Sequence, residues 1–258
     1  MPPTELTYEE LDHVGTITID RPEARNALTF TTYAEIEEAV RGTTARCLII
    51  TGTDPAFCSG DDVKKIMSKA GDQVSANLEA SPRLTSLCDA LLHTDIPVVA
   101  AVNGAAVGWG MELALMADIR VASERAKLGE LFVLRGLCSD VAGIGRLAQL
   151  VGRERAAELL FTGRIVDASE ALALGLVSRV VPHEELLPTA LELAGAIAAN
   201  PPLAVQRLKA GLREALDPDW SELGVWVSAS LGELFQTADH KEGVAAFREK
   251  RVPRYEGR

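Results

Sequence analysis

The chain has 258 residues and few of the side chains that build disulfides or metal sites. The cysteines show neither C-x-x-C spacing nor pairing with histidine at metal-site intervals, so they are interpreted as small core residues in a reducing compartment. No metal or redox cofactor is predicted. These cysteines are Cys47, Cys58, Cys88 and Cys138. The scattered histidines are interpreted as surface or turn residues: His13, His93, His183 and His240.

Basic residues are also scarce. Lys and Arg number 26 against 37 Asp and Glu, for a net charge of −11. This balance argues against a nucleic-acid footprint or a polybasic membrane patch, but leaves room for an anionic ligand in a local basic pocket. The first ten residues lack the basic and apolar regions of a signal peptide. We therefore expect a cytoplasmic protein without nucleic-acid or membrane partners.

No uninterrupted apolar run is long enough for a membrane span. The most apolar stretch, 96–117, is broken by Pro97, Asn103, Glu112 and three glycines. A strand, a loop and a buried helix fit this pattern better than a transmembrane helix. Apolar residues still make up 47% of the chain, which is enough to bury one large core.

Strand and helix signals alternate through the first two thirds of the chain. An alternating pattern indicates a half-buried strand, and continuous apolar runs indicate strands covered on both faces. Such alternation predicts an α/β fold with largely parallel strands. For the first helix, Thr29, Thr31 or Thr32 is the predicted N-cap. Strands are predicted at 14–20, 47–52, 96–104 and 118–123, and helices at 28–40 and 82–94.

The character changes from about residue 184, where four successive segments have helical periodicity. We find no strand signal after 176–181. This quarter carries Trp220, Trp226 and Phe235, more apolar surface than a thin appendage would leave exposed. The pattern predicts a core region, 1–183, followed by a helical oligomerisation region, 184–258.

Two segments share the order strand, glycine-bearing turn, helix: "CLIITGTDPAFCSGDDVKKI" and "VVAAVNGAAVGWGMELAL". Such turns expose the N–H groups of a helix's first turn. Either one alone is most simply a tight turn. Two N–H groups converging on one oxygen would form an oxyanion hole, and glycine would let a substrate approach the backbone.

Together these residues resemble the crotonase (enoyl-CoA hydratase/isomerase) superfamily. The resemblance implies a spiral of β-β-α units and a C-terminal helical region that forms trimers, commonly paired into hexamers. It also implies an acyl-CoA thioester substrate that reacts through an oxyanion-stabilised enolate without a separate cofactor. The matching segments are "RPEARNAL", "AFCSGDDV", "IPVVAAVNGAAVGWGMELALMADIRVAS", "LVGRERAAELLFTGRIVDASEALALGLVSRVV", "NPPLAVQRLK" and "EGVAAFREKR".

By position, the resemblance assigns the two oxyanion-hole N–H groups to Asp61 and Trp109. Both depart from the small residues common there. An Asp61 carboxylate facing the oxyanion would repel it, so we expect this side chain to point away. Trp109 is expected to narrow or stack over the acyl pocket while still donating its N–H, and a collapsed oxyanion hole is the alternative. Phe132 is also expected to alter the shape of this pocket.

Glu112 matches the first catalytic acid/base position of the family. Phe132 stands where the second glutamate is usual, so the common pair of carboxylates is missing. Glu130 would share the Phe132 face if this segment were a strand, and its reach is left open. Asp140 matches the catalytic aspartate of dienoyl-CoA isomerases, with a helix N-cap as the competing interpretation. Glu112 and Asp140 are the predicted catalytic residues.

The loop "RPEARNAL" resembles the one that receives the CoA moiety, with Arg25 and Ala27 as contacts, although Arg25 could equally be a solvated loop charge. Lys250 matches a position that reaches a neighbouring subunit's CoA phosphate, with Phe247 near the same pocket. Lys250 could instead balance a helix dipole.

The function predicted from these residues is hydration of a 2-enoyl-CoA. Double-bond isomerisation of an enoyl-CoA or dienoyl-CoA is the alternative reaction. A non-catalytic acyl-CoA-binding protein is the alternative of another class, favoured by Phe132 and opposed by Glu112.

Overall fold

The computed structural model describes residues 4–63, 66 and 83–258 of the chain. Its larger sheet is six-stranded, in the spatial order β1-β2-β3-β5-β7-β10. β1 and β2 pair antiparallel, and the remaining neighbours pair parallel. The strands are β1 (Leu6–Leu11), β2 (Val14–Ile19), β3 (Cys47–Gly52), β5 (Val98–Val102), β7 (Ile119–Ser123) and β10 (Arg179–Val181).

A second sheet has four short strands in the order β4-β6-β8-β9. Strands of the first sheet are followed in the chain by strands of the second: β3 leads to β4, β5 to β6 and β7 to β8. Helices come after these pairs, so the predicted spiral of β-β-α units is confirmed. The short strands are β4 (Ala56–Cys58), β6 (Ala105–Val107), β8 (Lys127–Gly129) and β9 (Val166–Asp167).

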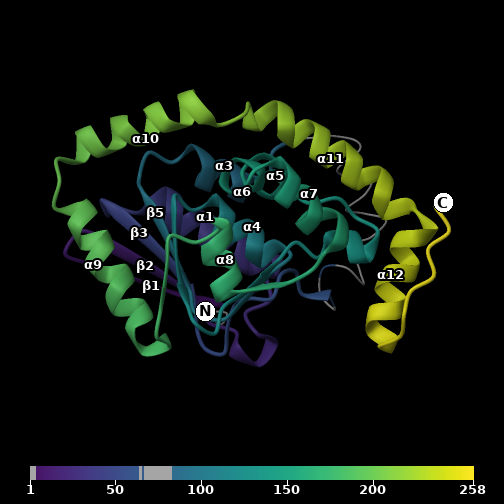
Figure 1. Ribbon diagram of the computed structural model, residues 1–258. Coiled ribbons are helices and arrows are strands. Elements are labelled where there is room, and N and C mark those ends of the chain that lie inside the picture. The colour runs from purple at the N-terminus through teal and green to yellow at the C-terminus, as the bar shows by residue number, and fades with distance from the viewer. Residues whose placement is uncertain (1–3, 64–65, 67–82) are drawn as a thin grey trace.

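Helices pack around both sheets, and α10 and α11 arch from α9 on one side of the molecule to α12 on the other (Figure 1). The α-helices are α1 (Phe30–Gly42), α3 (Ser86–His93), α4 (Trp109–Met116), α5 (Val141–Gly145), α6 (Leu147–Val151), α7 (Arg153–Thr162), α8 (Ala168–Leu174), α9 (Leu186–Ala198), α10 (Pro202–Leu216), α11 (Trp220–Gln236) and α12 (Ala238–Glu249). Short 3-10 helices include η1 (Pro22–Ala24), η3 (Phe132–Arg135) and η4 (His183–Glu185).

Strand alternation divides the interior into two cores. On β3, Leu48 and Ile50 face the main core between the sheets, whereas Cys47 and Ile49 face α9. Ala190 and other small residues of α9 let this helix lie close to the sheet. The helix that follows the predicted boundary at residue 183 thus covers one face of the larger sheet, and the boundary itself stays a prediction.

The predicted helix starts can be compared with the N-caps of α1 and α3. Thr29, one of the three predicted candidates, is the N-cap of α1: its hydroxyl accepts from the Thr32 N–H, while Thr32 Oγ1 accepts from the Thr29 N–H. Such reciprocal bonds satisfy donors that the helix itself cannot. The predicted helix 82–94 is α3, which begins at Ser86; its predicted first residue, 82, lies outside the described residues.

One expectation was wrong, and one conditional expectation does not apply. His240, expected at the surface, is buried, and its Nδ1 lies 2.7 Å from the Arg135 carbonyl oxygen. β8 ends at Gly129, so Glu130 and Phe132 do not share a strand face; Phe132 instead begins η3. The stretch 96–117 contains the predicted strand (β5) and the predicted buried helix (α4), but the predicted loop between them includes the short strand β6. No helix within the described ranges is long and apolar enough to cross a bilayer.

Candidate functional site

The two glycine turns meet at the start of α4. Gly60 and Gly108 have φ values of +86° and +54°, which favour glycine. A Cβ on Gly60 would lie 3.3 Å from the Trp109 nitrogen, so the turns are in contact. Among the described residues, neither the Asp61 N–H nor the Trp109 N–H donates to a backbone carbonyl. The two predicted oxyanion-hole donors therefore lie beside each other and are available to a ligand.

A cavity of about 530 Å³, here called the loop cavity, opens beside these donors. It contains both predicted CoA contacts of the 21–27 loop, Arg25 and Ala27, and also Phe247 of α12. The Arg135 guanidinium stacks 4.4 Å above the Phe247 ring. The lining holds three basic residues, Arg21, Arg25 and Arg135, and three acidic ones, Glu23, Asp61 and Asp62. Since Arg21 is paired with Asp62, Arg25 and Arg135 are the cations that suit a phosphorylated ligand.

Buried polar contacts hold the 21–27 loop in place. The Asn26 side chain accepts from the Arg21 N–H at 2.9 Å and donates to the carbonyl oxygens of Thr53 and Ala56. The Arg21 guanidinium donates to the Ala27 carbonyl and pairs with Asp62 at 3.1 Å. Arg21 therefore fixes the cavity wall, while Arg25 is exposed and free to meet a ligand.

A second cavity of about 380 Å³, here called the apolar cavity, lies on the other side of Trp109. Trp109 packs edge-on against Tyr33, with ring centroids 4.8 Å apart. Both cavities share four lining residues: Asp61, Trp109, Phe132 and Leu137. The two cavities thus adjoin at the N–H pair. Other walls of the apolar cavity are Phe30, Ala34, Leu87, Leu231 and Phe235.

The Asp61 carboxyl group is held by α1. The Tyr33 hydroxyl donates to Asp61 Oδ1 at 2.6 Å. Burial raises the pKa of Asp61 to about 6, although the Tyr33 hydrogen bond opposes this shift. The carboxyl group therefore changes charge within the range where enzymes usually work.

Asp140 lines the apolar cavity and also caps α5. Its Oδ1 accepts from the Val141 N–H at 2.8 Å, and the Trp109 side chain hydrogen-bonds to it. Burial raises the pKa of Asp140 above the usual value, while these two donors oppose the shift. The two interpretations of Asp140, helix cap and reactive carboxylate, are therefore compatible in one geometry.

Glu112 has no exposed surface. Its Oε2 accepts from the Ala142 N–H at 2.9 Å, the Gly143 N–H lies 3.0 and 3.1 Å from its two oxygens, and Ser139 Oγ lies 3.0 Å from Oε1. Burial raises the pKa of Glu112 well above its usual value, as do the Glu130 and Asp140 charges, against the effect of these donors. Asp140 is thus the predicted carboxylate that faces a cavity, and Glu112 is held behind that surface.

Some residues of the site escaped the sequence interpretation. Arg21 and Arg135 carry charge in the loop cavity, and Ser139 joins Glu112 to Glu130. Arg21 opens the "RPEARNAL" segment, so its position was a usable signal. Lys250 is exposed at the C-terminal end of α12, and its predicted contact with a neighbouring subunit's ligand stays a prediction.

Comparison with known proteins gives the family. The model of the enoyl-CoA hydratase/isomerase family matches residues 9–258. A crotonyl-CoA hydratase of Syntrophomonas wolfei subsp. wolfei is 36% identical, over 95% of each chain. The chain belongs to the enoyl-CoA hydratase/isomerase family, the crotonase superfamily, and is an enzyme of that family.

Solved structures agree with this assignment. An enoyl-CoA hydratase from Mycobacterium avium subsp. paratuberculosis has a TM-score of 0.86 at 27% identity, over 99% of this chain and 100% of that one. A carnitinyl-CoA hydratase from Mycobacterium avium has a TM-score of 0.82 at 33% identity, over 99% and 100%. The crotonase fold expected from the sequence is confirmed.

Proposed function

We propose that the protein hydrates a 2-enoyl-CoA thioester to the 3-hydroxyacyl-CoA. The observation that carries this proposal is the pair of neighbouring N–H groups, Asp61 and Trp109, where the loop cavity adjoins the apolar cavity. A thioester oxygen at this point would accept from both donors as it gains negative charge. Each donor is worth roughly 2.7–4 kcal/mol in such a transition state.

The two cavities suit the two ends of the substrate. Arg25 and Arg135 suit the CoA phosphates, and the apolar cavity suits the acyl group. Asp140 then accepts a proton from the water that adds to C3. Glu112 is proposed to deliver a proton to C2, which requires the bound acyl group to reach the buried carboxyl group behind the wall of the apolar cavity. One carboxyl group removes a proton and the other supplies one, so the net reaction adds one water molecule.

Double-bond isomerisation is the second candidate, and a specific observation favours it. Phe132 stands in place of a second glutamate, and Asp140 is a carboxylate that lines the apolar cavity. A single carboxylate between C2 and C4 can move a proton from one carbon to the other without adding water.

Turnover of crotonyl-CoA and of a 3-enoyl-CoA tests these proposals. We expect crotonyl-CoA to lose its enoyl absorbance and to gain the mass of one water. Asp140→Asn and Glu112→Gln should each lower kcat by about 100-fold or more, as expected for loss of an acid or base. Conversion of the 3-enoyl-CoA to the 2-enoyl-CoA without a mass change, and no reaction of crotonyl-CoA, would instead establish the isomerase.

We also propose a setting for this activity. The chain is proposed to act in the cytoplasm without a metal or redox cofactor, since CoA arrives as part of the substrate. The helical region 184–258 is proposed to form a homotrimer, or a hexamer of paired trimers, in which Lys250 reaches the CoA phosphate of a neighbouring subunit. Exposed apolar side chains on this region, such as Leu208 and Trp226, support that proposal.

A further inference from the structure

Two buried glutamates are joined by one hydroxyl group. Ser139 Oγ lies 3.0 Å from Glu112 Oε1 and 2.5 Å from Glu130 Oε2. Glu112 and Glu130 are 0% and 1% exposed, and Ser139 is also buried. The two carboxyl groups therefore interact through Ser139 rather than through bulk water.

This geometry requires a proton on one of the carboxyl groups. A serine hydroxyl has one proton and can donate to only one acceptor. The second carboxyl group must then donate to Oγ itself, because two unprotonated oxygens at 2.5 Å would repel each other. One of the two carboxyl groups, Glu112 or Glu130, is therefore protonated in this arrangement.

The surrounding donors place that proton on Glu130. Glu112 accepts from the N–H groups of Ala142 and Gly143, which favour its charged form. Glu130 Oε1 is buried and has no hydrogen-bond partner among the residues that the structure describes. Since an unpaired buried oxygen disfavours charge, Glu130 carries the proton and Ser139 donates to Glu112.

Burial makes ionisation unfavourable for both glutamates, and the pKa of Glu112 is also raised well above its usual value. Burial raises the pKa of Glu130 to about 8, with the charge of Asp140 adding to the shift. The groups that face Glu130 are Glu112 of α4 and Ser139 and Asp140 just before α5, and its cavity is also lined by Cys138, Asp239 and Arg258. Because the pKa of both glutamates is raised, the placement of the proton on Glu130 rests on backbone N–H groups that, within the described residues, donate to Glu112 and not to Glu130.

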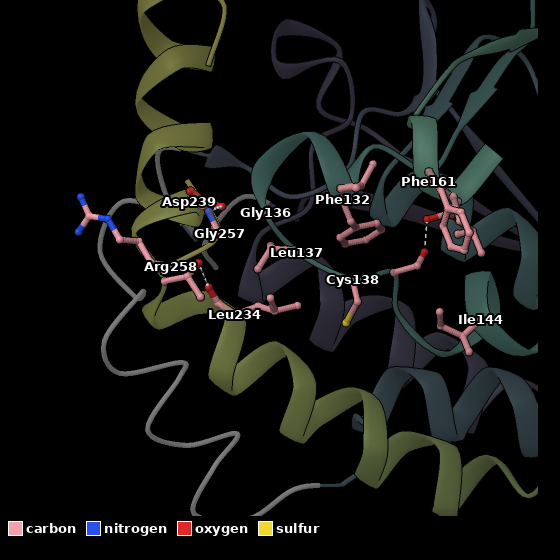
Figure 2. Close-up of a pocket in the computed structure, with 15 residues that line it drawn as sticks. Phe132, Gly136, Leu137, Cys138, Ile144, Phe161, Leu234, Asp239, Gly257 and Arg258 are labelled. Carbon is pink, nitrogen blue, oxygen red and sulfur yellow. Dashed lines mark hydrogen bonds between the residues drawn. The ribbon is translucent and has the colours of Figure 1, made fainter. Parts of the chain in front are cut away.

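Glu130 and Ser139 also line a third cavity, here called the C-terminal cavity, of about 580 Å³. Figure 2 shows its length, with Phe161 near one end and Asp239, Gly257 and Arg258 at the other. Phe161 is 78% exposed and Arg258 is exposed, so the cavity reaches the surface at both places. Glu130 therefore lies at the wall of the C-terminal cavity and not at the wall of the loop cavity or the apolar cavity.

We propose that Glu130 and Ser139 are positioning residues that conduct protons from the C-terminal cavity to Glu112. This inference rests on the proposed hydration. Glu130 gives its proton to Ser139 Oγ as Ser139 gives its own to Glu112, and Glu112 then protonates C2. Water in the C-terminal cavity restores the proton of Glu130, and Asp140 releases to solvent the proton that it took from the attacking water. One water is added to the substrate, and no net proton is consumed.

Glu130→Gln is the main test, because its amide keeps the size of the side chain and can donate to Ser139 but cannot ionise. We expect kcat to fall by about 10- to 100-fold with little change in KM. The change in kcat with pH that is caused by ionisation of Glu130 should be absent in this variant. Ser139→Ala should lower kcat similarly, and Ser139→Thr, which keeps a hydroxyl, should restore most of it.

A matched control is Ser228→Ala, since Ser228 of α11 is a buried serine whose Oγ has no hydrogen-bond partner among the described residues. It should leave kcat and its pH profile unchanged. A Glu130→Gln enzyme with the wild-type kcat and pH profile would overturn the proposal.

Infrared spectroscopy gives a readout that does not depend on turnover. The wild type should show the C=O stretch of a buried protonated carboxyl group at neutral pH, and Glu130→Gln should lack it. Persistence of this band in Glu130→Gln would overturn the placement of the proton. If the wild type hydrates no enoyl-CoA, the proposed function fails, while the band still decides whether Glu130 holds the proton.

Discussion

Asp61 has both a backbone N–H proposed to bind the substrate and an ionisable side chain close to it. Its N–H is proposed to bind the thioester oxygen, and the residue lines both cavities that adjoin there. The Tyr33 hydroxyl at 2.6 Å holds the carboxyl group toward α1. Because a negative charge near a developing oxyanion opposes it, the protonation state of Asp61 should affect the rate.

A pH series on Asp61→Asn tests this effect. The pKa of Asp61 is raised to about 6, so the carboxyl group is neutral below that pH and charged above it. The ratio of kcat/KM in Asp61→Asn to that in the wild type should therefore rise as pH passes through about 6 and level off above. We expect a rise of about tenfold, equivalent to ~1.4 kcal/mol.

Tyr33→Phe provides the control for that series. Removing the hydroxyl donor should raise the pKa of Asp61 further. When both enzymes carry Tyr33→Phe, the ratio of kcat/KM in the Asp61→Asn enzyme to that in the enzyme that keeps Asp61 should therefore change at a higher pH. A ratio that stays flat across the whole range would show that the Asp61 charge does not reach the reacting oxygen.

The family resemblance assigned Trp109, Asp61 and Asp140, and their roles stay predictions. The structure places all three on the lining of the apolar cavity, but the contacts between site residues were not predictable from the sequence. The bond from Ser139 to Glu130 depends on where β8 ends and η3 begins, a boundary that one residue pattern does not fix. In the loop cavity Arg135 lies against Phe247 of α12, a contact between distant parts of the chain that the sequence does not reveal.

Among the elements, long apolar runs were predictable and short strands were not. The run 47–52 was predicted as a strand and is β3. β4, β6 and β8 have three residues each, too few for a period of two to be recognised. β1 was not predicted either, because five of its six residues are exposed and give no burial pattern. These strands are fixed by their partners rather than by their own composition.

The contact between α4 and β4 sets how closely the two glycine turns approach. A Cβ on Gly110 would lie 2.0 Å from the Cys58 carbonyl oxygen, so Gly110→Ala must push α4 away from β4. We expect a loss of about 1–3 kcal/mol in the free energy of unfolding, typical of overpacking. Urea unfolding at a fixed protein concentration measures it.

Gly195 of α9 supplies the matched control. A Cβ there meets nothing within 4 Å. Gly195→Ala should stabilise the protein by ~0.5–1 kcal/mol, because alanine favours a helix over glycine. If Gly110→Ala and Gly195→Ala changed the free energy of unfolding by the same amount, the tight contact between α4 and β4 would be contradicted.

For the whole molecule, α10 reverses the usual arrangement of an amphipathic helix. Its polar side faces the protein: Lys209 is buried and pairs with Asp118 at 2.8 Å, and Arg213 donates to the Thr94 carbonyl. Its leucines face outward, spaced at i, i+4 and i+8. Leu208, Leu212 and Leu216 are 70%, 62% and 64% exposed. A helix that turns an apolar stripe outward gains stability only when another surface covers that stripe.

The proposed trimer supplies that surface, so charges on the stripe should dissociate it. Leu208→Glu combined with Leu212→Glu should convert the oligomer to monomers in analytical ultracentrifugation, because each charge would be buried without a partner. Glu214→Gln, at an exposed polar position of the same helix, should leave the oligomer intact. If the leucine variant keeps the wild-type mass, α10 is not the interface. If both the variant and the wild type are monomeric, the proposed assembly is wrong.

Since Lys250 is proposed to contact the CoA of a neighbouring subunit, the monomeric variant should also show a raised KM for acyl-CoA.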